Sequence, residues 1–168
     1  MFTLTTDSAV DVFRSELDRL GVYWVPLTYT IDGNIYADDF SDDARYKEFY
    51  DEIRKGALPV TSQINPYEHE EFWEKVIEKA GHRDIVHLTL SSGLSKTYAS
   101  ACNAAASFME KHPDCRVYVV DSLGATQAEM PVFEMALRLR DAGESAAAAA
   151  GALRAYSHRI QVYIIGDD

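Results

Sequence analysis

A run of hydroxyl side chains follows an apolar stretch near the middle of the chain. The stretch 84–90 is rich in β-branched residues, and Ser91, Ser92, Ser95 and Thr97 come directly after it. Apolar residues then recur at helical spacing, so the hydroxyls are predicted to lie in a turn between a strand and a helix N-terminus. Free backbone N–H groups and the positive end of the helix dipole attract anions at such a place. The turn is therefore a candidate site for a carboxylate or a phosphate.

Two other polar turns also follow predicted strands, namely Asp7-Ser8 and Asp121-Ser122. The carboxyl ends of parallel strands meet at one edge of a sheet, and open α/β folds bind ligands at that edge. Both turns are therefore expected beside the hydroxyl turn. The polar loop that contains Thr61-Ser62 could reach the same edge.

Apolar strands alternate with helical patterns along the whole chain. This alternation predicts an α/β fold with a mostly parallel sheet and helices on both faces, like a Rossmann- or flavodoxin-like three-layer domain. At 168 residues, one such domain over 1–168 is expected. Strands are predicted at 2–5, 22–27, 84–90, 116–121 and 160–165, with a hairpin of 29–31 and 35–36 around Asp32-Gly33. Helices are predicted at 8–20, from 38–43 to 56, at 66–80, 98–109, 131–142 and 144–156.

The composition excludes several classes of partner. A net charge of −11 disfavours nucleic acids and anionic membrane surfaces. Neither a signal segment nor a stretch long enough to span a bilayer is visible in the sequence. Cys102 and Cys115 are the only cysteines, which fits reduced thiols in a cytoplasmic protein, with a disulfide between them as the alternative.

Four motifs taken together carry a resemblance to a known family. In chain order they are Thr6-Asp7-Ser8, Thr61-Ser62-Gln63, the segment 90–98 and Val120-Asp121-Ser122. Their order and spacing resemble those of the DegV family over essentially the whole chain. The resemblance implies a bacterial, cytoplasmic, non-enzymatic protein that binds a long-chain fatty acid without a cofactor or a metal. It also implies a partner, a fatty acid kinase, that phosphorylates the bound acid.

The resemblance assigns roles to individual positions. Thr61 and the pair Ser91-Ser92 would bind the fatty acid carboxylate, and Ser62 and Gly93 would shape the binding turn. The Asp-Ser motifs would support the neighbouring loops without touching the ligand, and these are Asp7, Ser8, Asp121 and Ser122. A carboxylate held by neutral hydroxyls and backbone N–H groups needs no lysine or arginine, because charge-assisted hydrogen bonds remain strong away from water.

The chain departs from the family pattern in three respects. Lys96 stands where the family usually has glycine, and 127–130 replaces a glycine-rich stretch. Family members are also about a domain longer, so this chain resembles their N-terminal domain alone, without the C-terminal domain that forms much of the lipid tunnel; 166–168 resembles the crossing point. Apolar surface left uncovered in this way would favour self-association.

Several alternative functions fit parts of the same pattern. A phosphate- or nucleotide-binding loop is suggested by Lys96-Thr97, although the glycine that the Walker pattern needs before the lysine is Ser95. A small-molecule hydrolase could use Ser91 or Ser92 with a histidine base, but no nucleophile signature is present. The acidic stretch 38–43 could bind a metal, yet it also suits a solvated helix start. Each hydroxyl taken singly could simply cap a helix.

The five histidines were considered as bases for the hydrolase alternative. His87 is predicted to be a structural residue inside its strand. The others are predicted to lie at the surface near helix ends or loops, and they are His69, His82, His112 and His158.

Overall fold

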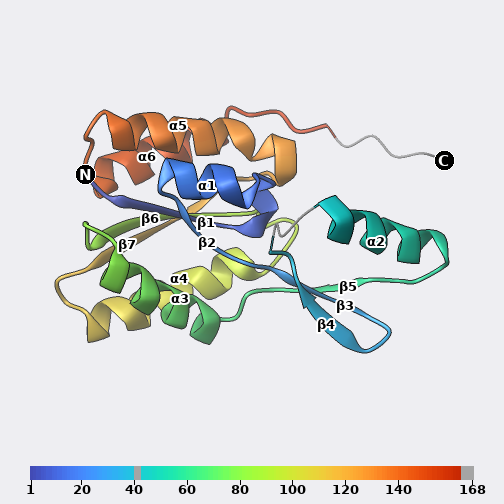
Figure 1. Ribbon diagram of the computed structural model, residues 1–168. Helices are drawn as coiled ribbons and strands as arrows, with labels where there is room; N and C mark the ends of the chain where they lie inside the picture. The colour runs from blue at the N-terminus through green and yellow to red at the C-terminus, as the bar shows by residue number, and fades with distance from the viewer. Residues whose placement is uncertain (40–42, 164–168) are drawn as a thin grey trace.

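Four parallel strands form the main sheet, which we call sheet A (Figure 1). The computed structural model describes residues 1–39 and 43–163, with residues 43 and 44 described by their backbone alone. The strand order is β2-β1-β6-β7, with β1 at Thr3–Asp7, β2 at Tyr23–Val25, β6 at Asp84–Thr89 and β7 at Arg116–Asp121. The chain runs outward from β1 to β2 and then crosses to β6, so the strand order reverses between β1 and β6.

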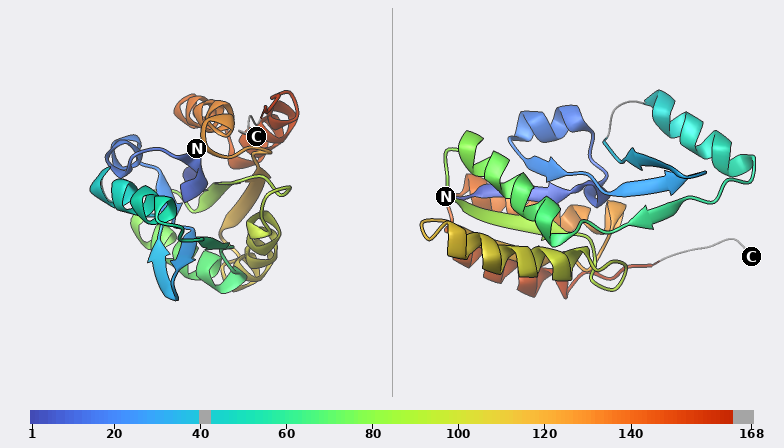
Figure 2. Two further views of the ribbon diagram at one scale, coloured as in Figure 1. Left: turned by 90° about the vertical axis from the view of Figure 1, so that its right-hand side faces the viewer. Right: turned by 90° about the horizontal axis from the view of Figure 1, so that it is seen from below.

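Helices cover both faces of sheet A, as the left view of Figure 2 shows. One face is covered by α1 (Arg14–Leu20), α5 (Met130–Asp141) and α6 (Ala146–Ser157), and the other by α3 (Pro66–Lys79) and α4 (Thr97–Lys111). Successive strand residues point to opposite faces: Val86 and Leu88 pack toward the first group of helices, and Ile85 toward the second. The predicted α/β class and three-layer arrangement are confirmed.

A smaller antiparallel sheet, sheet B, lies beyond the carboxyl ends of the sheet A strands (Figure 1). Its order is β4-β3-β5, with β3 at Thr28–Ile31, β4 at Asn34–Ala37 and β5 at Val60–Ser62, and α2 (Asp43–Arg54) connects β4 to β5. Asp32 and Gly33 have φ values of 49° and 80°, as a type I′ turn requires, so the predicted hairpin is confirmed. Part of the loop predicted around Thr61 is instead β5.

Two predicted elements differ from the structure. The helix expected at 8–20 is split into a short 3₁₀ helix, η1 (Ser8–Val10), and α1, because Asp11 adopts a left-handed conformation at φ 56°. The strand expected at 160–165 is wrong for 160–163, since residues 161–163 are exposed and pair with no strand in the described part of the chain. Ile164 and Ile165 lie outside the described residues, as does 166–168.

Two further predictions concern the thiols and the membrane. Cys102 and Cys115 are both free, so the predicted reduced state is confirmed over the disulfide alternative. Within residues 1–39 and 43–163, none of the helices combines the length and the apolar character that crossing a membrane needs.

Candidate ligand-binding site

Aspartate side chains tie the polar turns together at the carboxyl edge of sheet A. Leu90 N donates to Asp7 Oδ2 at 2.9 Å, across the point where the strand order reverses. Ser92 N donates to Asp121 Oδ1 at 3.1 Å. Asp7 is fully buried, and its other oxygen accepts a hydrogen bond from Ala9 N at 3.0 Å. The prediction that the two Asp-Ser turns lie beside the hydroxyl turn at one edge is confirmed.

The serines of the two Asp-Ser motifs are buried and bonded to nearby backbone. Ser8 Oγ accepts from Leu27 N at 3.0 Å, and the Ser8 hydroxyl also bonds to the Asp38 carboxylate. Ser122 Oγ accepts from Gly124 N and donates to Gly124 O, both at 3.2 Å. The motifs therefore hold the loops around the site in place.

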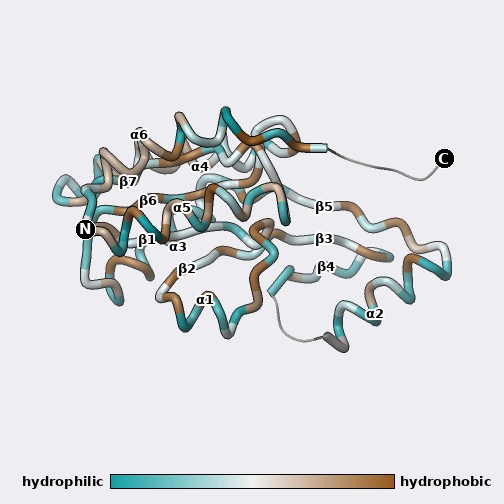
Figure 3. Tube along the Cα trace, turned by 90° about the horizontal axis from the view of Figure 1, so that it is seen from above, coloured by the Kyte–Doolittle hydropathy of each residue, from teal (hydrophilic) through white to brown (hydrophobic). Residues whose placement is uncertain are grey.

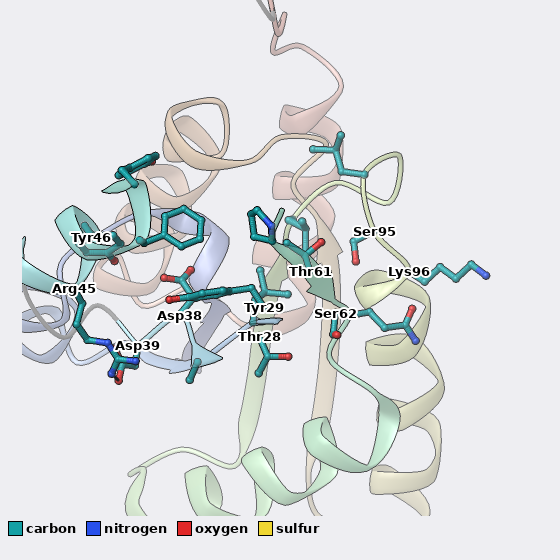
Figure 4. Close-up of a pocket in the computed structure, with 18 residues that line it drawn as sticks. Thr28, Tyr29, Asp38, Asp39, Arg45, Tyr46, Thr61, Ser62, Ser95 and Lys96 are labelled. Atoms are coloured by element: carbon teal, nitrogen blue, oxygen red, sulfur yellow. Dashed lines mark hydrogen bonds and ion pairs between the residues drawn. The ribbon is translucent and has the colours of Figure 1, made fainter. Parts of the chain in front are cut away.

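A cavity of about 510 Å³ lies between the edge of sheet A and the smaller sheet (Figure 4). Its volume falls within the range of roughly 300–1,000 Å³ that is usual for small-molecule sites. One wall is formed by sheet B and α2, with Tyr29, Tyr46 and Phe49. The other wall includes Leu90 at the end of β6 and the segment that precedes α4.

Hydroxyl groups gather at one end of this cavity, which we call the hydroxyl end. Thr61 and Ser62 from β5 line it together with Ser95 and Lys96. In Figure 4 the hydroxyls of Thr61 and Ser95 face each other, while the Lys96 side chain extends away from them.

The opposite end, which we call the acidic end, contains Asp38 and Asp39. Arg45 Nη1 lies 3.5 Å from Asp39 Oδ2. Burial, together with neighbouring Asp38, raises the pKa of Tyr46 to about 12, and burial also raises the pKa of Asp38. The two ends of the cavity thus differ in chemistry. The hydroxyl end presents hydroxyls beside Lys96, whose side chain extends away, and the acidic end presents two carboxyl groups, one of which pairs with Arg45.

Aromatic rings line the cavity between its two ends, and we call them the aromatic wall. Tyr29 and Phe49 meet edge to face with ring centroids 4.9 Å apart, and Phe49 meets Tyr50 in the same way at 5.2 Å. Such rings offer a large apolar surface to a ligand.

Ser95 occupies the place at the start of α4 that the sequence suggested for Ser91 and Ser92. Its Oγ accepts a hydrogen bond from Thr97 N at 3.2 Å and lies 2.9 Å from Thr97 Oγ1. Thr97 Oγ1 in turn accepts from Ile64 N at 3.4 Å, so the start of α4 is joined to the segment after β5. Ser95 therefore brings a hydroxyl to both the cavity and the helix N-terminus.

The predicted ligand residues fall into two groups. Thr61 and Ser62 line the cavity, whereas Ser91, Ser92 and Gly93 lie just outside its lining, in the turn after β6. Ser91 N donates to Gly124 O at 2.8 Å, and Ser91 Oγ accepts from Gly93 N at 3.2 Å. Ser92 is exposed at the same edge. Direct carboxylate binding by Ser91 and Ser92, and the shaping of the turn by Gly93, stay predictions.

The aromatic wall has no counterpart among the sequence predictions, and the acidic stretch 38–43 is predicted only as a metal site or a solvated helix start. Tyr46, Phe49 and Tyr50 recur at helical spacing, which predicts a helix but not that these rings line a cavity. The signal that could have revealed the aromatic wall is Tyr29 on the hairpin, which adds a further aromatic ring to those of the helix. Asp39 lies in the connection from β4 to α2, and Arg45 lies in the first turn of α2. No pattern in the sequence predicts that these two residues pair.

Two histidines are buried together beneath sheet A. The rings of His69 and His87 have centroids 5.1 Å apart, and Thr5 Oγ1 lies 2.8 Å from His87 Nδ1. The prediction for His87 is confirmed, and the surface position predicted for His69 is wrong because α3 turns His69, Trp73 and Val76 toward the core. Burial lowers the pKa of His69 to about 4 and that of His87 well below its usual value.

The site geometry gives little support to the hydrolase and metal alternatives. No histidine is among the described residues that line the cavity, which gives a hydrolase no base there. Among residues 1–39 and 43–163, no three His, Cys, Asp or Glu side chains are grouped so that they could hold a metal ion. Of the acidic stretch 38–43, residues 40–42 lie outside the described residues, so the metal hypothesis for that stretch is addressed only in part.

Comparisons with known proteins place the chain in a family. The family described as "uncharacterised protein, DegV family" matches residues 1–168. A DegV domain-containing protein of Clostridium perfringens is 31% identical over 144 residues, which are 86% of this chain and 49% of that relative.

Two solved structures share the fold at higher coverage. A stearic-acid-binding protein from Eubacterium ventriosum has a TM-score of 0.77 at 27% identity, over 91% of this chain and 52% of its own. A structure on the fatty acid binding of a DegV family protein from Thermus thermophilus has a TM-score of 0.77 at 31% identity, over 94% of this chain and 53% of its own. The chain spans about half the length of the relatives that it matches.

Proposed function

Because the chain belongs to the DegV family, we propose that it binds a long-chain fatty acid in the cavity between its two sheets. The carboxylate lies at the hydroxyl end, and the acyl chain extends along the aromatic wall. The observation that carries this proposal is the difference in chemistry between the two ends of one cavity. The fatty acid binding named for the two solved relatives supports it.

Electrostatics set the orientation of the ligand. A carboxylate at the acidic end would meet Asp38 and Asp39, and like charges at short range in a cavity repel strongly. Arg45 at the same end already pairs with Asp39, so a ligand carboxylate there would compete with Asp39 for this cation. At the hydroxyl end, Thr61 and Ser95 offer neutral donors, and hydrogen bonds to an ionised acceptor are about twice as strong as neutral ones. The preferred orientation therefore places the charged group between β5 and the start of α4.

The remaining predicted residues support this arrangement, either within the cavity or from the loops around it. Ser62 adds a hydroxyl to the hydroxyl end, and the turn Ser91-Ser92-Gly93 holds the backbone that leads to Ser95. The Asp-Ser motifs fix the loops around the cavity.

The family resemblance extends the proposal to the whole protein. In this view residues 1–168 contribute the carboxylate-binding half of a fatty acid site, and a second domain of the kind found in longer relatives completes the acyl tunnel. The bound acid is presented in the cytoplasm to a fatty acid kinase, and this protein itself acts as a carrier rather than an enzyme. Self-association through apolar surface is a further part of the proposal.

A titration with a long-chain fatty acid tests the proposal. The double variant Thr61→Val and Ser95→Ala removes both facing hydroxyls, and we expect the affinity to fall by about tenfold or more, since hydrogen bonds to charged groups contribute roughly 1.5–3 kcal/mol. Thr30→Val on β3 is the matched control, because Thr30 lies outside the lining of the cavity. Equal affinities for the native protein and the double variant would contradict the proposed site.

A separate variant distinguishes the cavity from the turn beside it. Ser92→Ala removes an exposed hydroxyl that lies outside the lining. We expect a smaller loss of affinity than for Thr61→Val, measured in the same titration. A larger loss for Ser92→Ala would instead support direct binding by the turn after β6.

A further inference from the structure

A buried glutamate without a hydrogen-bond partner stands behind the ligand turn. Glu129 lies between the short 3₁₀ helix η2 (Thr126–Ala128) and α5, and it is fully buried. Neither Oε1 nor Oε2 has a hydrogen-bond partner within the described part of the chain. An ionised carboxylate in this position would have lost its water without gaining a donor, which is costly.

The ionisable groups that face Glu129 are both acids, Asp7 from β1 and Asp121 from β7. Neither η1 nor η2 carries an ionisable side chain. Farther out, Asp38 faces Asp7, while Tyr98 lies near both Asp121 and Arg154.

The proton of this group of acids belongs on Glu129. Asp7 accepts hydrogen bonds from Ala9 N and Leu90 N, so two donors stabilise its charged form. Asp121 Oδ1 likewise accepts from Ser92 N and from Leu123 N, the latter at 3.0 Å. Glu129 has no such donor, and burial together with the two neighbouring acids raises its pKa well above the usual value.

These hydrogen bonds are the ones that position the ligand turn. Leu90 N and Ser92 N bracket the end of β6, and the segment that they hold leads to Ser95 in the cavity. We propose that Glu129 is a positioning residue of the ligand site. As a neutral acid it lets Asp7 and Asp121 hold this turn. When Glu129 loses its proton to solvent at alkaline pH, the three acids are forced apart and ligand binding weakens.

A close backbone contact would transmit a movement of Glu129 to the hydroxyl turn. A Cβ added at Gly124 would lie 2.7 Å from both C and O of Ala128 and 2.9 Å from Glu129 N, so η2 packs directly on the backbone at Gly124. Gly124 O accepts the hydrogen bond from Ser91 N. Movement of Glu129 therefore reaches the hydroxyl turn by a path separate from the aspartates.

The inference rests on the proposed function where it concerns the fatty acid, and a pH titration of fatty acid affinity tests that part. Between about pH 6.5 and about pH 9.5 the ligand carboxylate stays ionised. We expect the affinity of the native protein to fall by about tenfold or more toward the alkaline end, since each pKa unit of linkage corresponds to tenfold. The variant Glu129→Gln should bind the fatty acid with the same affinity at both limits of this pH range, whatever that affinity is.

Two further variants control the experiment. Glu134→Gln lies on the same helix, where the native side chain is exposed and pairs with Arg138, and it should follow the native pH profile. Glu129→Met removes the titrating group without adding an amide, so it should also be insensitive to alkali. If Glu129→Gln fails to fold, Glu129→Met decides the outcome. A native affinity that stays constant with pH, or variants that lose affinity as the native protein does, would overturn the proposal.

A second readout does not depend on a ligand. Amide hydrogen exchange at Leu90 N and Ser92 N should accelerate toward alkaline pH more in the native protein than in Glu129→Gln at the same pH. If no fatty acid binds at any pH, the proposed function fails, and this difference in exchange still decides whether Glu129 positions the turn. Equal exchange in the two proteins would overturn that role.

Discussion

The two sheets of this molecule are stabilised in different ways. In sheet A, β1 is buried at all five of its residues and β6 at all but the first, and carboxylates join the strand ends. In the region of sheet B, large apolar side chains are exposed, with Ile35 at 74%, Leu58 at 85% and Val60 at 65%. Figure 3 shows hydrophobic stretches both along the strands of sheet A and in the segment that leads into β5, so the two regions differ in burial rather than in hydropathy.

The contrast indicates a division of labour around the cavity. Regions with few buried apolar contacts open at a lower free-energy cost than a core sheet does. Sheet A therefore provides a fixed edge that carries Ser95, and sheet B provides a wall of lower local stability that carries Thr61 and the aromatic rings. A ligand that contacts both walls would stabilise sheet B more than sheet A, because binding adds stability only where the bound and open states differ.

The largest effect is expected from truncating the core beneath sheet A. Trp73 is fully buried, so Trp73→Ala should lower the free energy of unfolding by about 3–5 kcal/mol. Phe49 is only half-buried, and Phe49→Ala should cost roughly 1–2 kcal/mol of stability while weakening fatty acid binding. Denaturant titrations measure the first effect and ligand titrations the second. Equal losses of stability would remove the distinction between the two regions.

Acid should weaken sheet A through its buried histidines. The pKa of His69 is lowered to about 4, so the unfolded chain binds more protons between about pH 6.5 and about pH 4. The stability that neutral His69 provides is complete above about pH 6.5, falls by about 3 kcal/mol as the pH drops, and levels off below about pH 4.

The variant His69→Gln isolates this effect, because glutamine does not titrate. Burial raises the pKa of Asp7 to about 6. Protonated Asp7 therefore adds stability at pH values below the ordinary aspartate pKa, and this stability is lost as the pH rises through about 6. That opposing change is present in both proteins and cancels in the difference between them. Unfolding free energies of the native protein and the variant that stay parallel from neutral to acid pH would contradict the assignment.

A smaller effect is expected from Gly124→Ala at the edge of sheet A. The new Cβ would meet the Ala128 carbonyl at 2.7 Å, so η2 must shift, at a cost of about 1–3 kcal/mol. Gly93→Ala is the matched control, since its nearest contact is Ser91 Oγ at 3.4 Å and its φ is not left-handed. Thermal unfolding measures both variants. A larger loss for Gly93→Ala would show that the turn, rather than the contact with η2, limits stability.

The sequence predicts sheet A better than sheet B for a physical reason. In sheet A, β6 and β7 contain runs of β-branched and apolar residues. Asn65 with Pro66 marks the start of α3 through a capping box that involves Glu68. In contrast, β5 is three residues long and pairs with β3 so that Thr61 lies opposite Tyr29. So short a strand is too brief to show the alternation of apolar and polar residues that identifies strands in a sequence.

The candidate site shows the same limit. The hydroxyl pattern pointed to the edge of sheet A beside which the cavity lies, and the family resemblance pointed to Thr61 and Ser62, which line the cavity. Local spacing could not distinguish Ser95 from its neighbours, because which hydroxyl faces the cavity depends on where α4 begins. No pattern in the sequence predicts that Glu129 is buried, because its burial depends on how η2 packs beside Gly124.

The orientation of the ligand is the central claim, and it can be measured directly. In a complex with a fatty acid labelled with ¹³C at the carbon next to the carboxylate, the protons of that carbon should give NOEs to the methyl group of Thr61 and to the β-protons of Ser95. NOEs from the same protons to the rings of Tyr46 and Phe49 alone would place the carboxylate at the acidic end and contradict the account.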